Sequence, residues 1–214
     1  MRLVLVGDTH GYHTQIKVPD GDIFIHAGDF CNTGSAIEVM RFNNWLGTLP
    51  HEFKIVIAGN HDLFMESDPY LGRRLITNAA YLENEELYLS NGLSVWGSPI
   101  TPAFNDWAFN KKRGNEIAKY WKQIPSYIDI IVTHGPPYNI LDLSANYEHL
   151  GCYDLWHRIN QIQPKLHIFG HIHESYGLFN KLPNKTFDFD TLFGNCSVMN
   201  DNYEVVNPPL VIEL

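Results

Sequence analysis

The chain contains 214 residues, of which 44% are hydrophobic, and its 15 basic and 24 acidic side chains give a formal net charge of −9. This length suits a single domain over residues 1–214 with a large core, and the hydrophobic content excludes a disordered chain. The acidic balance disfavours a long nucleic acid as partner, whereas a small anionic substrate held by bound cations is compatible with it.

The sequence offers little indication of membrane targeting, of disulfide bonds or of a cysteine-bound zinc ion. No apolar run is long enough for a membrane span or a signal-peptide core, so we expect no membrane partner and a cytoplasmic location. Cys31, Cys152 and Cys196 are scattered and form no C-x-x-C pair. They are therefore predicted to be buried free thiols rather than disulfides or zinc ligands. The sequence does not indicate an oligomeric state.

Strand-like and helical patterns alternate through the first part of the chain. Residues 3–6, 23–27 and 54–58 are mostly apolar runs, which is typical of strands buried on both faces. Residues 35–49 begin with the spacing of a capping box and continue with apolar side chains at helical intervals, so they predict a helix. A second helix is expected to start at residue 68, where an aspartate precedes a proline. This βα rhythm indicates a layered α/β protein.

The middle of the chain combines a hairpin signal with a segment of no clear period. Residues 87–96 place two short β-like runs around an Asn-Gly pair, which is the strongest short-range hairpin signal. Residues 101–110 are expected to form a long surface loop that overhangs the functional site. Phe104, Trp107 and Phe109 in this loop either stack a substrate base or anchor the loop in the core.

The later part of the chain returns to alternating helices and strands. Helices are predicted over residues 113–124 and 153–162, because each helical pattern is closed by a proline. Strands are predicted over residues 128–133 and 166–169. Residues 186–214 carry only short β-like runs.

Side chains that bind metal ions follow five of the predicted strands. In open α/β sheets ligands gather at the carboxyl ends of strands, so these side chains are expected to converge. The set is Asp8, His10, Asp29, Asn60, His61, His134, His171 and His173. These side chains are too many for one tetrahedral zinc but suit two ions that share a carboxylate. Two ions can activate a bridging water to hydroxide and neutralise phosphoryl oxygens, which indicates phosphoester hydrolysis.

Short motifs surround these residues in a characteristic order. They are G-D-T-H at 7–10, G-D at 28–29, G-N-H-D at 59–62, T-H-G-P at 133–136 and G-H-I-H at 170–173. This order resembles that of the calcineurin-like metallophosphoesterases. A finer pattern consists of H-G-P-P-Y-N-I-L-D at 134–142, H-L-G-C at 149–152 and N-P-P-L-V at 207–211. It resembles the branch that contains the animal MPPED phosphodiesterases.

The resemblance implies a four-layer αββα sandwich of two mixed β-sheets flanked by helices, with a binuclear metal centre at the strand ends. It also implies how the ligands divide. Asp8, His10 and His173 would hold one ion, Asp29 would bridge, and Asn60, His134 and His171 would complete the second ion. The family uses manganese, iron or zinc, and we expect two Mn²⁺ ions here.

The resemblance assigns further roles beside the ligands. His61 would not bind metal but would face the leaving-group oxygen and donate a proton or a charge-assisted hydrogen bond. Asp62 is a candidate catalytic partner that orients His61, with a capping or structural role as the alternative. Asn60 and His149 are candidate substrate-binding residues, and the alternative for His149 is an ordinary hydrogen-bonded loop histidine.

The predicted function is a metal-dependent phosphodiesterase that hydrolyses small phosphodiesters such as cyclic nucleotides. Residues 28–34 lack the arginine and the second aspartate that protein phosphatases of the superfamily carry in this loop, which disfavours phosphoprotein substrates. Two alternatives stay open. DNA-processing relatives share the five motifs, so a metal-dependent nuclease is one. The other is a metal-binding scaffold without turnover, because the family includes a retromer subunit.

Overall fold

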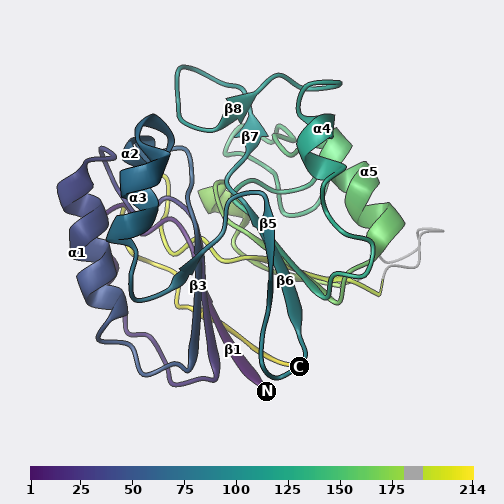
Figure 1. Ribbon diagram of the computed structural model, residues 1–214. Coiled ribbons are helices and arrows are strands. Elements are labelled where there is room, and N and C mark those ends of the chain that lie inside the picture. The colour runs from purple at the N-terminus through teal and green to yellow at the C-terminus, as the bar shows by residue number, and fades with distance from the viewer. Residues whose placement is uncertain (181–189) are drawn as a thin grey trace.

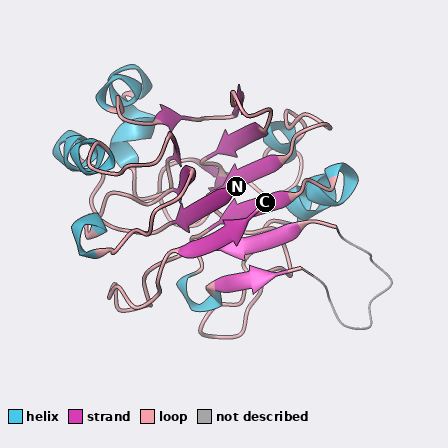
Figure 2. Ribbon diagram, turned by 90° about the horizontal axis from the view of Figure 1, so that it is seen from below, coloured by secondary structure: helices cyan, strands magenta, loops and turns pink. Residues whose placement is uncertain are grey.

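The computed structural model describes residues 1–180 and 190–214. These residues form a four-layer αββα sandwich, in which two mixed β-sheets pack face to face and helices cover their outer faces (Figure 1). Figure 2 shows the strands gathered between the helices when the molecule is seen from below. The fold class predicted from the sequence is confirmed.

The first sheet has the strand order β13-β1-β2-β3-β4. Its strands are β1 (Arg2–Val6), β2 (Ile23–Ala27), β3 (Phe53–Ile57), β4 (Ala80–Tyr81) and β13 (Leu210–Glu213). β1 to β4 run parallel, and β13 pairs antiparallel with β1. Its outer face carries α1 (Ala36–Leu46), α2 (Leu63–Ser67) and α3 (Pro69–Leu75), on the left in Figure 1.

The second sheet has the strand order β11-β12-β10-β9-β6-β5. Its strands are β5 (Glu85–Tyr88), β6 (Ser94–Ser98), β9 (Ile130–Thr133), β10 (Leu166–Phe169), β11 (Gly177–Phe179) and β12 (Leu192–Asn195). The inner strands run parallel, whereas β5 and β11 pair antiparallel at the edges. Helices α4 (Ala118–Trp121) and α5 (Tyr153–Ile162) cover this sheet, on the right in Figure 1.

The central strands are apolar on both faces because both faces are buried. In β1, Leu3 and Leu5 belong to the cluster packed between the two sheets. Val4 and Val6 point the other way and share a cluster with Phe42 of α1. Alternate residues of one strand thus fill two layers of core, which holds the strand ends in fixed positions.

Several sequence predictions hold in the structure. Helix α1 starts at the predicted capping box, in which Ser35 and Glu38 satisfy each other's backbone N–H groups. Helix α3 starts with proline after Asp68, whose side chain accepts the N–H of Leu71. The hairpin around Asn-Gly is β5–β6, and the three cysteines are buried and free. In the C-terminal stretch predicted to carry short β-like runs, residues 186–189 lie outside the described residues. The rest of that stretch contains β12 and β13.

Other predictions were wrong. The helix expected over residues 113–124 is reduced to α4, because Gly114 adopts a left-handed φ of +83° and only turns precede Ala118. The segment 101–110 is a loop only between its ends, because β7 (Thr101–Pro102) pairs with β8 (Asn110–Lys111). Helix α2 was missed, because five residues are too few to show a helical period.

We expect the protein to lose stability in acid partly through His13. This imidazole is buried against Phe42 and Trp45, and burial lowers its pKa from 6.5 to about 4. Between these pH values the unfolded chain binds a proton that the folded chain excludes. The free energy of unfolding therefore decreases as the pH is lowered through this window, by up to about 1.4 kcal/mol per pH unit.

The variant His13→Leu tests this linkage, because leucine fills the site without titrating. Urea unfolding at about pH 7 and about pH 5 should show a smaller loss of stability for the variant than for the wild-type protein. Other buried histidines, such as His167 with a pKa lowered to about 3 by burial, keep part of the slope in both proteins. An equal loss in the two proteins would contradict the assignment to His13.

Candidate metal centre

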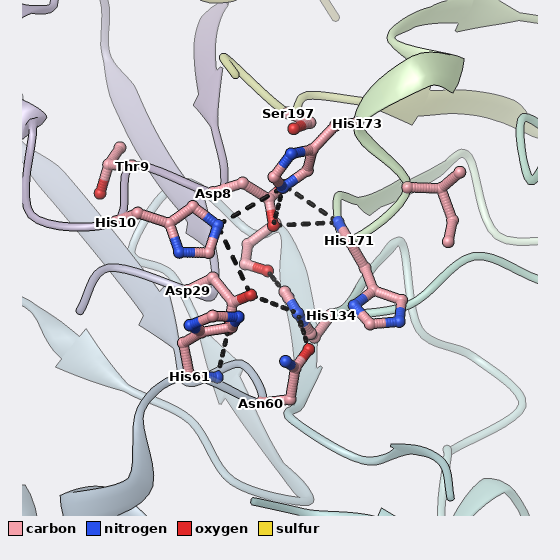
Figure 3. Close-up of polar contacts among 12 residues, drawn as sticks. Asp8, Thr9, His10, Asp29, Asn60, His61, His134, His171, His173 and Ser197 are labelled. Carbon is pink, nitrogen blue, oxygen red and sulfur yellow. Dashed lines mark hydrogen bonds and ion pairs between the residues drawn. The ribbon is translucent and has the colours of Figure 1, made fainter. Parts of the chain in front are cut away.

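The carboxyl ends of five strands bring the predicted ligands to one place. In the first sheet, β1 leads to Asp8, β2 to Asp29 and β3 to Asn60; in the second, β9 leads to His134 and β10 to His171. The strands that carry these residues are neighbours within their sheets. Figure 3 shows the side chains converging on one small volume, as the order of motifs predicted.

The chain leaves these strands in backbone conformations that non-glycine residues rarely adopt. Asp8, His10, Asp29 and His171 have left-handed φ values of 54°, 41°, 54° and 70°. Such residues cost about 1–3 kcal/mol each and cluster at functional sites. Close approach adds a further constraint, because a Cβ on Gly170 would lie only 2.1 Å from Asp8 Oδ2.

One group of potential ligand atoms comes from Asp8, His10 and His173, and these atoms lie within 4.8 Å of one another. Nε2 of His10 and Nε2 of His173 are 3.4 Å apart, and His173 Nε2 is 3.8 Å from Asp8 Oδ1. His173 Nδ1 donates to the carbonyl oxygen of Asn200 at 3.1 Å, because a carbonyl only accepts. This hydrogen bond turns Nε2 inward. The backbone N–H of His171 donates to both Asp8 oxygens, at 3.1 and 3.0 Å.

A second group comes from Asp29, His134 and His171. His134 Nε2 lies 3.3 Å from Asp29 Oδ2 and 2.9 Å from Asn60 Oδ1, so the Asn60 amide joins this group. On the opposite side of the ring, His134 Nδ1 donates to the carbonyl oxygen of Ala27 at 2.9 Å. That bond aims Nε2 at the centre.

Asp29 lies between the two groups. Its Oδ2 is 3.3 Å from His134 Nε2 in one group and 3.8 Å from His10 Nε2 in the other. Its Oδ1 accepts the backbone N–H of His61 at 2.7 Å. A carboxylate held in this position can contact cations on both sides.

The two aspartates are ionised despite complete burial. Burial raises the pKa of Asp8, but the hydrogen bond and charge of His173 outweigh it and lower the pKa to about 2. The pKa of Asp29 is lowered in the same way, because the charge and hydrogen bond of His134 outweigh burial. Burial lowers the pKa of His134 and His173, and the carboxylates raise it to about 9 in each. A metal ion must compete with these protons, so its affinity falls in acid.

The residues present fit divalent metal ions. Burial lowers the pKa of His10 to about 4 and of His171 to about 3, so both imidazoles are neutral near pH 7 as metal ligands must be. Carboxylate oxygens, an amide oxygen and imidazole nitrogens together suit manganese, iron or zinc better than calcium or magnesium.

Among the described contacts, no hydrogen bond joins the side chains of His61 and Asp62. His61 Nδ1 instead lies 2.9 Å from the carbonyl oxygen of Asn32. The buried Asp62 carboxylate accepts the backbone N–H groups of Cys31 at 2.8 Å and Gly59 at 2.7 Å. The prediction that Asp62 orients the His61 ring is therefore corrected. Asp62 ties the loop after β2 to the loop after β3, and its pKa is raised to about 8 by burial and by the charge of nearby Asp29.

His149 lies apart from the converging ligands. Its Nδ1 is 2.7 Å from Oδ1 of Asp142, a buried residue whose Oδ2 accepts the backbone N–H groups of Asn139 and Gly151. These contacts give His149 a structural partner within its loop. Its role in substrate binding stays a prediction.

A cavity of about 290 Å³ opens onto the centre, at the small end of the range for small-molecule sites. The predicted residues that line it are His10, Asp29, Asn60, His61, His171 and His173. Phe104 and Trp107 also line it, so the segment 101–110 borders the site as predicted, whereas Phe109 is buried in the core. The remaining lining residues are Leu150, Ile172, Glu174, Asp201 and Tyr203. Asp8 and His134 are fully buried beneath this lining.

Tyr203 is a site residue that the sequence analysis missed. Its ring meets those of His10 and His173, with centroids 4.8 and 5.6 Å apart. Its turn is held by Asn200, whose Oδ1 accepts two backbone N–H groups of the same turn. The Asn-Asp-Asn run at residues 200–202 does signal a turn. No local pattern relates that turn to histidines far away in the sequence.

Comparison with known proteins agrees with this geometry. The sequence profile described as calcineurin-like phosphoesterase matches residues 1–175. The chain belongs to this family. As a calcineurin-like phosphoesterase it is placed among metal-dependent hydrolases of phosphoric esters, and its buried His and Asp groups agree with that assignment.

Alignments with two relatives extend over the full length of this calcineurin-like phosphoesterase. Metallophosphoesterase domain-containing protein 1 of Homo sapiens is 40% identical over 238 aligned residues, which cover 100% of this chain and 71% of that protein. A UPF0046 protein of Caenorhabditis elegans is 34% identical, covering 100% of this chain and 60% of that protein. The solved structure of TT1561 from Thermus thermophilus shares the fold, with a TM-score of 0.56 at 11% identity over 91% of this chain and 88% of that one.

The length and hydropathy of the described helices bear on whether any of them could span a membrane. Within residues 1–180 and 190–214, none of them is long and apolar enough to cross a bilayer.

Proposed function

We propose that the protein is a two-metal phosphodiesterase that hydrolyses small phosphodiesters, with cyclic nucleotides as candidate substrates. The observation that carries the proposal is the position of Asp29 between two groups of ligand atoms, beside a cavity that His61 also lines. A carboxylate between two cations can hold them close together, and two-metal phosphoester chemistry uses ions about 3.5–4 Å apart.

Two Mn²⁺ ions are the proposed cofactors, with iron or zinc as alternatives. One ion would be held by Asp8, His10 and His173 and the other by Asn60, His134 and His171, with Asp29 shared. When bound, the ions would generate the nucleophile from water and neutralise the charge that develops on the phosphoryl oxygens.

The protein's own groups supply the remaining chemistry. His61 Nδ1 donates to the carbonyl oxygen of Asn32, which leaves Nε2 for the substrate. In the proposed reaction His61 acts as the imidazolium, protonated at both ring nitrogens, and the leaving-group oxygen takes the Nε2 proton, a general-acid role that this side chain can fill near neutral pH. Asn60 would contact the substrate phosphate beside its metal.

The charge of the cavity wall supports a diester over a monoester. Glu174 and Asp201 line the cavity, and each adds negative charge when ionised. A phosphomonoester dianion meets more repulsion there than a diester monoanion. The loop after β2 places Asn32 and Thr33 where protein phosphatases of the superfamily carry aspartate and arginine, so the side chain that would grip a dianion is not present in that loop.

The test compares bis-p-nitrophenyl phosphate with p-nitrophenyl phosphate, using protein stripped of metal and refilled with manganese. We expect metal-dependent turnover of the diester well above that of the monoester. Asn60→Ala removes an amide oxygen 2.9 Å from His134 Nε2, so turnover should fall by about 10–100-fold or more in this control. Turnover of neither ester by metal-loaded protein would contradict the proposal and favour a binding scaffold, and preference for long DNA would favour a nuclease.

A further inference from the structure

The imidazole of His61 is only partly fixed by hydrogen bonding. Among the described contacts its side chain makes one hydrogen bond, from Nδ1 to the carbonyl oxygen of Asn32 at 2.9 Å. One bond at one edge of the ring leaves the ring free to turn about that contact. A general acid must reach the leaving-group oxygen within about 3 Å, so the plane of the ring needs a second constraint.

Trp107 provides a surface that sets this plane. The indole and the imidazole of His61 are stacked, with ring centroids 4.2 Å apart and planes 25° from parallel. The ring of His10 meets that of His61 nearly at right angles, at 4.6 Å and 82°. Stacked and edge-to-face contacts of these two kinds are favourable arrangements of aromatic rings beyond the burial they provide. Together they oppose rotation of the imidazole out of its observed plane.

Trp107 is itself held by its neighbours. The backbone N–H of Ala108 donates to the carbonyl oxygen of Asn60 at 3.2 Å, which ties the segment to the strand end that carries a candidate ligand. The next residue, Phe109, is buried in the core, and its N–H donates to Oε1 of Glu66 in α2 at 2.9 Å. The indole therefore rests on a segment anchored to the metal centre.

We propose that Trp107 is a positioning residue for His61 and holds the imidazole in the plane from which Nε2 protonates the leaving group. This inference rests on the proposed phosphodiesterase function. In the step concerned, water gives up a proton to solvent as its oxygen forms a bond to phosphorus. The bond from phosphorus to the leaving oxygen breaks with its electron pair, and that oxygen accepts the Nε2 proton of the His61 imidazolium, which is left neutral with its remaining proton on Nδ1. Misplacing a catalytic group by about 1 Å can cost on the order of 100-fold in rate.

The test uses two diesters that differ only in the leaving group. Methyl p-nitrophenyl phosphate releases a weakly basic phenolate that departs without a proton, whereas methyl phenyl phosphate releases a more basic one. In Trp107→Leu we expect kcat on methyl phenyl phosphate to fall by about 10–100-fold, with little change on methyl p-nitrophenyl phosphate. Trp107→Phe, which keeps an aromatic face, should recover most of the loss.

Tyr88→Leu is the control, because Tyr88 also stacks on an aromatic ring, that of Tyr127 with centroids 6.4 Å apart, but does not line the cavity at the metal centre. Its ratio of rates on the two diesters should equal the wild-type ratio. Metal content and thermal unfolding are measured for each variant. Should leucine unfold the protein, Trp107→Met carries the same test, since methionine fills similar space without an aromatic face.

The outcomes separate this inference from the function it rests on. Equal losses on both diesters in a folded, metal-loaded Trp107 variant would overturn the positioning role, because binding or folding would then explain the loss. A changed ratio in His61→Ala with an unchanged ratio in Trp107→Leu would also overturn it while sustaining the acid role of His61. An unchanged ratio in His61→Ala would overturn the acid role itself.

Discussion

His61→Ala is expected to retain its metal ions and to lose most of its turnover. The substitution removes the imidazole but keeps the backbone N–H that donates to Asp29 Oδ1 at 2.7 Å, so the shared carboxylate stays in place. Loss of a general acid lowers kcat by about 10²–10⁴-fold. The loss should be greatest on methyl phenyl phosphate, whose leaving group needs the proton.

The metal content of His61→Ala, measured together with its turnover, distinguishes a general acid from a metal ligand. Potential ligand atoms of His61, His10 and Asp29 also lie within 4.8 Å of one another, so the geometry permits His61 to be a metal ligand. Metal-depleted His61→Ala protein would show that it is one and would contradict the general-acid role. His157→Ala is the control, because this histidine is exposed on α5 and should leave both quantities unchanged.

Gly28→Ala is expected to lower the free energy of unfolding by about 2–5 kcal/mol. Gly28 has a φ of +94°, and a Cβ there would lie 2.7 Å from both the carbonyl oxygen of Ala58 and Nδ1 of His134. Ala58 contributes a backbone atom and His134 a fully buried ring. Moving either of them to make room for the new methyl group therefore costs free energy. Displacement of His134 should also weaken metal binding.

Gly92→Ala is the matched control for this substitution. Gly92 has a similar φ of +91°, but nothing lies within 4 Å of its Cβ position. The control therefore carries the backbone strain alone, about 1–2 kcal/mol. Urea unfolding of both variants isolates the crowding at Gly28. Equal losses in the two variants would show that crowding at the strand end contributes nothing.

The candidate ligands were predictable because they follow five strands within a few residues of the strand ends. An apolar run such as residues 3–6 is recognisable as a buried strand, and the carboxyl ends of neighbouring parallel strands meet at one edge. The structure accordingly brings Asp8, Asp29 and His134 together without any long-range information from the sequence. Local patterns failed where the segment was short or interrupted, as at α2 and at the turn of Gly114.

The sequence by itself determined the α/β class, the set of candidate ligands and the family, because strand, turn and polar residue are consecutive in each motif. Only the tertiary structure decided the partners of Asp62, the stack of Trp107 on His61 and the approach of Tyr203 to His10. These contacts join segments whose distance in space depends on how neighbouring strands pair and on how the two sheets pack. No periodicity within one segment encodes that packing, because it arises from burial summed over the whole core.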